Sequence, residues 1–445
     1  PIGTGNAQNA GIPLSQPANL SLAVVGVDFN PAGGNQEQEY VCLSNTAPLA
    51  VDLTGWKLTG GIEFTFAPGT VLPSNGVAYV SPNTRAFKAR DAGPRGGQGL
   101  FVLGPYQGQL SARGETVQVR DALGAMAGTY SYTGAPSAAQ QFLRITEIMF
   151  HPAATLGNPL DPDAFEYLEI ANISETITLD LTGVRLVNGI EFDFTGSAVS
   201  SLAPGARVLV VKNAAAFVAR YGPGRPVAGQ FTGNLNNAGE RIQLLDASNE
   251  EILDFSYDDD WHPLVDGLGF SLVLTDPTAP PEAWNGSSQW RPSSAPSGSP
   301  GLADPPPPVI AGVLITEALT RNDAPPPPDT IELHNPTEQP AEVGGWWLTD
   351  DFNTPAKFRI PNGTSIAPLD YLTFDATQFG AGDTGFGLGA DGDEVWLFSA
   401  DAAGQLTGYV HGHRFGAADD GVSFGLHVTS DRSEERRVGK ECRSR

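Results

Sequence analysis

One pattern of short apolar segments occurs three times along this chain, and it constrains the fold more than any other feature. The first segment reads VVGVDF (24–29), ITEIMF (145–150) and LITEAL (314–319). The second reads EYVCLSN (39–45), EYLEIAN (166–172) and DTIELHN (329–335). A turn glycine follows the last Asn of the second segment after 10, 11 and 10 residues. A spacing kept three times predicts a tandem array of one folding unit.

The segments have the polarity pattern of half-buried β-strands. In EYLEIAN, Leu168 and Ile170 fall on one face, and the residues between them fall on the other. Gly, Asn, Asp and Pro separate the segments at short intervals, as in β-sandwiches. Helix is expected only over 83–90 and 213–221, where an Asn stands at each N-cap position and Gly222 can end the second helix. The sequence therefore predicts an all-β protein.

A length of 445 residues suits about three domains. Composition places the boundaries, because 134–141 is rich in small residues and 285–308 is rich in Pro and Ser. The predicted organisation is a preceding linker or domain end (1–20), sandwich 1 (21–133), sandwich 2 (142–284), a linker (285–308), sandwich 3 (309–431) and a terminal segment (432–445).

The terminal segment, RSEERRVGKECRSR, differs in composition from the rest of the chain. Six of its fourteen residues are basic, in a chain with a net charge of −25. The segment resembles the translation of a sequencing adapter, so we expect 432–445 to be an artefact that contributes nothing to the fold. Without Cys442 the chain keeps only Cys42, which excludes an intrachain disulfide.

The second unit resembles the bacterial lamin-tail domain family through ITEIMFHP, EYLEIANISETITLDLTGVRLVNGIEFDF and GERIQLLDASNEEILDFSYDDDWHP. The third unit shares the pattern over 309–428, and the first is divergent, with Cys42 in the place of Glu169 and Glu332. This resemblance implies immunoglobulin-like sandwiches and non-catalytic modules of large exported bacterial proteins. It implies no catalytic residues.

The acidic balance makes some partners improbable. A net charge of −25 repels phosphate backbones and anionic lipid, so we expect no nucleic-acid partner. No stretch of 18 apolar residues is present, so we expect no membrane insertion. A protein or a surface polysaccharide is the expected partner, in the extracellular space or at the cell surface.

Acidic loops in the second unit are the candidate metal ligands. Carboxylates from loops are what Ca²⁺ prefers, although these residues do not follow the spacing of a known calcium loop. A solvated acidic surface is the competing interpretation, and no other cofactor is predicted. The candidate calcium ligands are Asp161, Asp163, Asp258, Asp259, Asp260 and Asp266.

Catalytic motifs are weak. GVSFG (421–425) matches G-x-S-x-G and would make Ser423 a nucleophile, but no helix is expected after it, so we predict a strand serine without catalytic function. His411 and His413 alternate and could share a strand face with Asp419 or Asp420, but no third ligand has a diagnostic spacing. We therefore expect no enzymatic activity in this part of the protein.

Apolar positions that repeat in register predict the core. In the second unit we expect the core to contain Leu168, Ile170, Leu186, Phe192, Val210, Ile242 and Leu244. Phe87, Phe217 and Phe379 are expected to close one end of each core. Trp56 and Trp346 should be core residues, whereas three others, in irregular segments, should be exposed for a ligand: Trp261, Trp284 and Trp290.

Together these observations predict spacer and interaction modules of a large exported or surface-attached bacterial protein. Two alternatives stay open. The modules could be accessory domains of an enzyme whose catalytic part lies elsewhere, or calcium-stabilised adhesion or glycan-binding modules.

Overall fold

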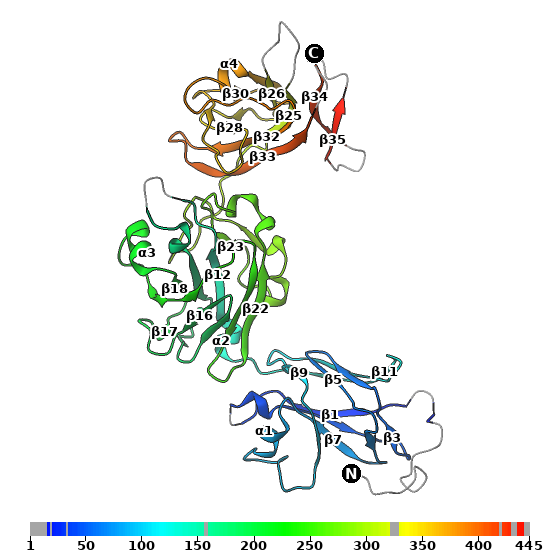
Figure 1. Cartoon of the computed structure of the whole chain (residues 1–445). Coiled ribbons are helices and arrows are strands. Elements are labelled where there is room, and N and C mark those ends of the chain that lie inside the picture. The colour runs from blue at the N-terminus through cyan, green and yellow to red at the C-terminus, as the bar shows by residue number, and fades with distance from the viewer. Residues whose placement is uncertain are drawn as a thin grey trace.

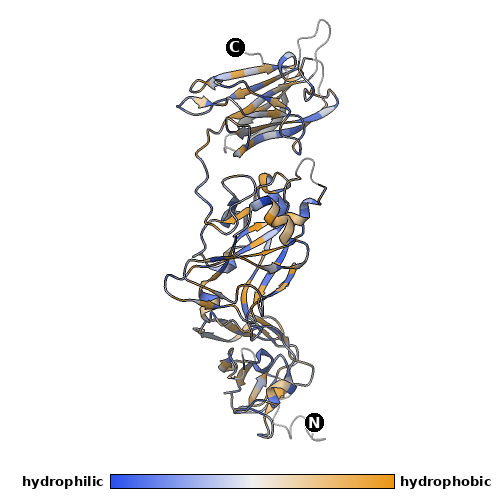
Figure 2. Cartoon of the chain, turned by 90° about the vertical axis from the view of Figure 1, so that its left-hand side faces the viewer, coloured by the Kyte–Doolittle hydropathy of each residue, from blue (hydrophilic) through white to orange (hydrophobic). Residues whose placement is uncertain are grey.

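The computed structural model describes residues 16–17, 20–32, 34–154, 159–320, 329–417, 421–428 and 434–439. These residues form three β-sandwiches that follow one another along one axis (Figures 1 and 2), here called domains 1, 2 and 3. The structure confirms the predicted all-β fold and its three repeats.

Domain 1 has two main sheets. The first has the order β1 (Ala23–Asp28), β2 (Tyr40–Ser44), β7 (Val77–Val80), β8 (Phe101–Leu103). The second has the order β11 (Met126–Tyr132), β10 (Glu115–Arg120), β4 (Lys57–Thr59), β5 (Ile62–Thr65), β9 (Gln107–Gly108). The remaining elements are the pair β3 (Val51–Asp52) and β6 (Val71–Leu72), the 3-10 turn η1 (Gln36–Gln38) and helix α1 (Thr84–Lys88).

Domain 2 repeats this plan with an extended first sheet. Its order is β19 (Val227–Gln230), β18 (Arg207–Val211), β13 (Tyr167–Asn172), β12 (Leu143–Met149), β23 (Leu272–Leu274), β24 (Trp290–Pro292). The second sheet has the order β20 (Thr232–Gly233), β16 (Ile190–Asp193), β15 (Arg185–Asn188), β21 (Glu240–Leu245), β22 (Glu251–Tyr257). The other elements are β14 (Leu179–Asp180) paired with β17 (Ser201–Leu202), helices α2 (Ala138–Phe142) and α3 (Ala214–Tyr221), and the 3-10 turns η2 (Pro162–Phe165), η3 (Asp259–Trp261), η4 (Pro263–Val265), η5 (Pro281–Ala283) and η6 (Ser287–Gln289).

Domain 3 has the same two layers. The first sheet has the order β31 (Tyr371–Asp375), β26 (Thr330–His334), β25 (Leu314–Leu319), β34 (Ser423–Val428), β35 (Glu434–Gly439). The second has the order β29 (Phe358–Arg359), β28 (Trp347–Thr349), β32 (Gly392–Ala400), β33 (Leu406–Gly416). β27 (Ala341–Glu342) pairs with β30 (Ser365–Ile366), and the helix is α4 (Ala376–Phe379).

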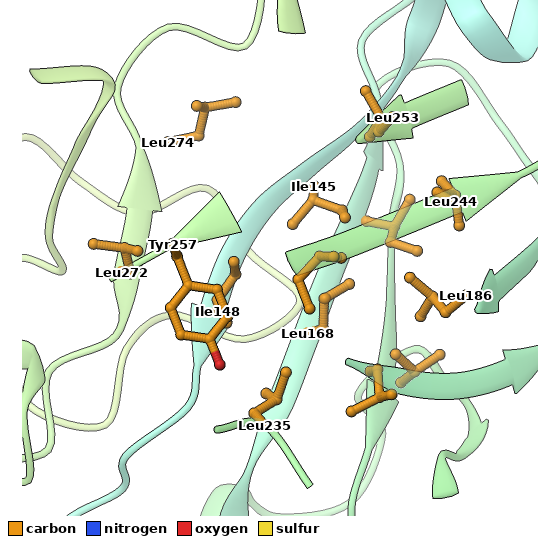
Figure 3. Packing of buried hydrophobic residues seen from close by; sticks show 14 of the residues in the cluster. Ile145, Ile148, Leu168, Leu186, Leu235, Leu244, Leu253, Tyr257, Leu272 and Leu274 are labelled. Atoms are coloured by element: carbon orange, nitrogen blue, oxygen red, sulfur yellow. The ribbon is translucent and has the colours of Figure 1, made fainter. Parts of the chain in front are cut away.

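The core of domain 2 lies between its two sheets, where alternating apolar side chains meet (Figure 3). Six of the seven predicted core residues are almost fully buried there: Leu168, Ile170, Leu186, Val210, Ile242 and Leu244. Phe192, the seventh, packs against the same core but is only half-buried, so it lies at the edge of the core. It lies near the end of β16, and its ring packs edge-on against the fully buried Phe194 at 4.9 Å.

The predicted helices form, but two of the three phenylalanines do not close the core. Asn83 and Asn213 cap α1 and α3 through their side chains, and Gly222 ends α3 with a φ of 78°. The ring of Phe87 packs on Tyr40 and Tyr79, and Phe217 packs on Tyr167. Both rings therefore cover the outer face of the first sheet, since each helix connects two parallel strands by a crossover over that face. Phe379 does lie in the core of domain 3.

Residues 285–304, predicted to be part of a linker, are folded onto domain 2. β24 extends the first sheet by pairing with β23. Trp284 and Trp290 are 0% and 2% exposed. Inside the core, Trp290 stacks on Phe255 and Trp284 packs edge-on against it. The prediction that these tryptophans are exposed is wrong, because Pro and Ser around them form turns that direct the rings inward. Trp261 is half-buried against the same core.

The terminal segment is not without structure. β35 pairs along its whole length with β34. The expectation that 432–445 takes no part in the fold is therefore wrong for the backbone of residues 434–439. An open sheet edge accepts a further strand through backbone hydrogen bonds, which depend little on sequence.

Candidate functional site

A pair of glutamates lies on the outer face of the first sheet of domain 2. Glu147 in β12 stands opposite Glu169 in β13. The register shifts between Ile145 and Glu147, and this bulge sets which residue of β12 faces Glu169. The first strands of domains 1 and 3 shift at the equivalent point.

Glu147 is buried, and one oxygen of its carboxylate accepts three hydrogen bonds. Its Oε1 accepts from the Tyr167 hydroxyl at 2.6 Å, the Ser271 hydroxyl at 2.5 Å and the backbone N–H of Ser299 at 2.8 Å. Burial raises the pKa of this carboxyl, although the three donors act in the opposite direction. Glu147 therefore serves as the centre of a buried polar network.

Glu169 connects three further parts of the domain. Its Oε1 accepts from the Thr146 hydroxyl at 2.7 Å and from Arg207 Nε at 2.9 Å. Its Oε2 accepts from the backbone N–H of Gly301 at 2.8 Å. Burial and then the charge of Glu147 raise the pKa of Glu169 to about 7, which Thr146 and Arg207 partly oppose.

The two glutamates hold residues 297–301, which we call the clasp. Ser299 and Gly301 of the clasp each donate one backbone N–H to one carboxylate. A Cβ added at Gly298 would lie 2.1 Å from Glu147 Oε1, and its φ of 70° also favours glycine. Arg225 donates to the carbonyl of Pro300 at 2.9 Å. Chemically, the pair is a receptor for a turn-forming Gly/Ser/Pro segment, in which Ser297, Gly298 and Gly301 have positive φ angles.

A second acid occurs at the start of the next strand in every domain. In each domain this acid accepts a hydrogen bond from the backbone N–H of a leucine. The pairs are Glu39 with Leu110 at 3.2 Å, Glu166 with Leu235 at 3.0 Å, and Asp329 with Leu388 at 3.0 Å. Burial raises the pKa of Glu39 and of Glu166 to about 8, and it raises that of Asp329. Sequence reasoning missed these residues. Their signal was an acid directly before each repeated strand.

The predicted calcium ligands serve local structure instead of meeting at one point. Asp161 and Asp258 cap η2 and η3. Asp163 and Asp260 lie in the turns that these two residues cap, and Asp259 lies beside Asp260 in η3. Asp266 Oδ1 is 2.6 Å from His151 Nδ1. Within the described ranges, no group of three or more His, Cys, Asp or Glu side chains could hold a metal ion. Calcium binding stays a prediction.

The residues considered for catalysis lie in different sheets. Ser423 begins β34, is 5% exposed, and its hydroxyl interacts with the carboxylate of Glu317. His411 and His413 lie in β33, where His411 Nδ1 accepts the backbone N–H of Ile315 at 2.9 Å. Asp419 and Asp420 lie outside the described residues.

The tryptophans predicted to be core residues, Trp56 and Trp346, are buried as expected.

The junction between domains 1 and 2 is held by polar contacts. Arg113 donates to the carbonyls of Gln140 at 2.9 Å and Ile252 at 2.6 Å. Gln36 donates to Glu250 Oε1 at 2.5 Å. Most of the connecting segment 134–141 leads into helix α2, which is capped by Ser137, so it is not the open linker that its composition indicated.

The junction between domains 2 and 3 is apolar. Phe398, on the outer face of β32, is fully buried and belongs to the same hydrophobic cluster as Leu264 and Val265 of domain 2. Trp347 and Trp396 lie beside it. The other two domains have polar residues at these positions. Trp347 corresponds to Lys57 in domain 1 and to Arg185 in domain 2. Trp396 corresponds to Gln118 in domain 1 and to Gln243 in domain 2. Aromatic residues replace polar ones only where this face meets a neighbour.

Comparison with known families places these observations in context. The family model described as Lamin Tail Domain matches residues 15–134, 136–259 and 306–412. No curated protein matches the chain. Across the described residues, no helix has the length and apolar character needed to span a membrane.

Proposed function

Because the chain belongs to the lamin tail domain family, we propose that it works as a stiff array of non-catalytic spacer and interaction modules in an exported or cell-surface bacterial protein. The observation that carries this proposal is that both junctions are fixed by specific contacts. Flexible tandem domains are the usual expectation when few contacts cross a boundary.

The two junctions restrict motion by different means. At the first, Arg113 bridges two backbone carbonyls of domain 2, so a hinge motion would break both of these hydrogen bonds. The carbonyl of Gln140 would keep only its bond from Arg144. At the second, Phe398 is buried against domain 2, so separation would expose an aromatic surface to water. Pro305–Pro308 add a short segment that favours an extended conformation.

Single-molecule FRET between dyes on domains 1 and 2 tests the proposal. We expect one narrow distance distribution for the native sequence. Arg113→Ala should broaden it, whereas Arg95→Ala, which removes an exposed arginine that bonds only within domain 1, should not. A broad distribution for the native sequence would contradict the stiff-spacer role.

The alternative role, calcium-stabilised adhesion, is tested separately by melting temperatures with and without Ca²⁺. If Asp258, Asp259 and Asp266 bind Ca²⁺, the melting temperature should rise in millimolar CaCl₂ relative to EDTA, and Asp259→Asn should remove the rise. Equal melting temperatures would remove this alternative.

A further inference from the structure

A lysine, an asparagine and a buried glutamate come together at the end of β18 in domain 2. Lys212 Nζ donates hydrogen bonds to Asn234 Oδ1 and to the carbonyl of Gly233. Glu166 stands opposite Lys212, whose backbone N–H donates to the Glu166 carbonyl at 3.0 Å. Glu166 Oε2 accepts the N–H of Leu235, the residue directly after Asn234. An amine, an amide and a carboxyl group therefore share one site.

The lysine and the asparagine belong to different sheets of the sandwich. Lys212 directly follows β18 of the first sheet, and Glu166 directly precedes β13 of the same sheet. Asn234 directly follows β20 of the second sheet. The lysine and the asparagine are 22 residues apart in the chain. A covalent bond between them would therefore tie the two sheets together.

The surroundings of the glutamate suit proton transfer. Glu166 is fully buried, and among the described residues its Oε1 has no hydrogen-bond partner. Burial raises the pKa of this carboxyl to about 8, although the N–H of Leu235 and the charge of Lys212 act in the opposite direction. The ring of the buried Phe231 has its centroid 5.9 Å from Lys212 Nζ. A carboxyl group that holds a proton at neutral pH thus lies beside the amine and the amide.

The comparison between domains separates this site from the structural role of the acid. The acid that binds the leucine N–H is present in all three domains. The position of Lys212 holds Pro82 in domain 1 and Ala376 in domain 3. The position of Asn234, directly before the leucine, holds Gln109 in domain 1 and Gly387 in domain 3. The leucine contact therefore does not explain why domain 2 has a lysine and an asparagine here.

We propose that the side chains of Lys212 and Asn234 join through an amide bond in the folded domain 2, with loss of ammonia, and that Glu166 transfers the protons. The chain thereby modifies itself. The bond is independent of the junctions on which the spacer role rests, and it adds a covalent connection inside one of the modules.

The reaction exchanges one amide for another. The neutral Lys212 amine attacks Asn234 Cγ with its lone pair, and protonated Glu166 donates a proton to Oδ1 as the Nζ–Cγ bond forms. The Glu166 carboxylate then takes a proton from Nζ and delivers it to Nδ2. The Cγ–Nδ2 bond breaks, ammonia leaves, and the proton on Oδ1 returns to Glu166. The reaction therefore balances without an oxidant or any other co-reactant.

Proximity is what makes this slow reaction feasible. Two groups in hydrogen-bond contact react in an intramolecular step, for which effective concentrations reach about 10⁵–10⁸ M in well-oriented cases. The bond has to form only once in the lifetime of each molecule. Lys212 is half-buried and Asn234 is exposed, so the ammonia can escape into the solvent. Its escape makes the bond permanent.

Intact-mass spectrometry of the folded full chain tests the proposal. We expect the native chain to weigh less than its sequence by one ammonia molecule. Lys212→Arg keeps the positive charge and removes the attacking amine, so it should restore the full mass, and so should Asn234→Ala. The matched control is Asn237→Ala, which changes another asparagine of the same loop and should keep the deficit. Circular dichroism checks that each variant is folded.

Glu166→Gln tests the proton transfer separately. Loss of a general acid and base slows a reaction by about 10²–10⁴-fold, so this variant should be isolated with the full mass. A deficit that survives in Glu166→Gln would overturn the role of Glu166. The lysine and asparagine variants decide about the bond itself, whatever the folding of the glutamate variant.

Trypsin digestion locates the bond. Trypsin does not cleave after a lysine whose side chain is an amide, so residues 208–220 should appear joined to residues 221–241, less one ammonia. Ring closure at an Asn-Gly pair such as Asn188 and Gly189 also releases ammonia, but it would leave 208–212 and 213–220 as separate peptides. The proposal is overturned by a native chain of full mass, by a deficit that survives Lys212→Arg, or by a deficit that maps to other residues.

Discussion

Ile170 occupies the centre of domain 2 without exposed surface, between strands that supply Ile145 and Val208 as its neighbours in register. Truncation to alanine removes three methyl or methylene groups and leaves a cavity. We expect Ile170→Ala to lower the free energy of unfolding by about 2–5 kcal/mol in urea titrations. Ile177→Ala, at a position that is 40% exposed, is the control and should stay within about 0.5 kcal/mol. A loss that small at Ile170 would contradict its assigned register.

Glu166 predicts a dependence of stability on pH. Burial raises its pKa from 4.5 to about 8 in the folded chain, so between these values the folded state binds more protons than the unfolded state. The free energy of unfolding should therefore fall as the pH rises from 5 to 8. Glu166→Gln should flatten this slope by at most about 1.4 kcal/mol per pH unit. Urea titrations at several pH values measure the slope, and an unchanged slope in the variant would exclude this role.

At the scale of elements, β35 raises the question of how much the terminal segment contributes to the stability of domain 3. Its sequence, EERRVG, contains one apolar residue, so it adds backbone hydrogen bonds at the edge and little apolar burial. The entropy of ordering these residues offsets that gain. We expect deletion of 432–445 to leave the melting temperature unchanged. A drop of several degrees in differential scanning calorimetry would show that the segment is a structural part of domain 3.

For the segment 285–304, amino-acid composition led to a wrong prediction, because the segment was expected to be a linker and is folded onto domain 2. Its Pro and Ser content is typical of linkers, yet Arg291 pairs with Asp304 at 2.6 Å and Trp290 lies in the core. The buried tryptophans were identifiable as large apolar residues but not as buried ones. Their burial depends on Phe255, which lies 29 and 35 residues earlier in the chain.

At the scale of the whole molecule, the arrangement of reactive groups predicts an absence of hydrolysis. Hydrolysis needs a nucleophile with a base in hydrogen-bond reach. Ser423 interacts with Glu317 in the first sheet of domain 3, whereas His413 lies in a strand of the second sheet. We expect residues 1–431 to show no esterase, phosphatase or nuclease activity, with or without divalent metal. Turnover that is lost in Ser423→Ala or His413→Ala would contradict this prediction.

The sequence alone determined the three repeats, the strands and most of the core. These features are local, because a period of two fixes which face of a strand is apolar, and a repeated spacing fixes the unit. The glutamate pair of domain 2 was visible only as members of repeated strands, and nothing in its pattern indicated what it binds.

The tertiary structure decided what covers each face. Glu147 meets Ser299 across 152 residues, and Arg113 meets Ile252 across 139. Local periodicity states that a side chain points away from the core but not which distant segment lies there. The clasp on domain 2 and the aromatic junction between domains 2 and 3 both depend on such distant contacts, so they follow from the packing of the chain and not from its local pattern.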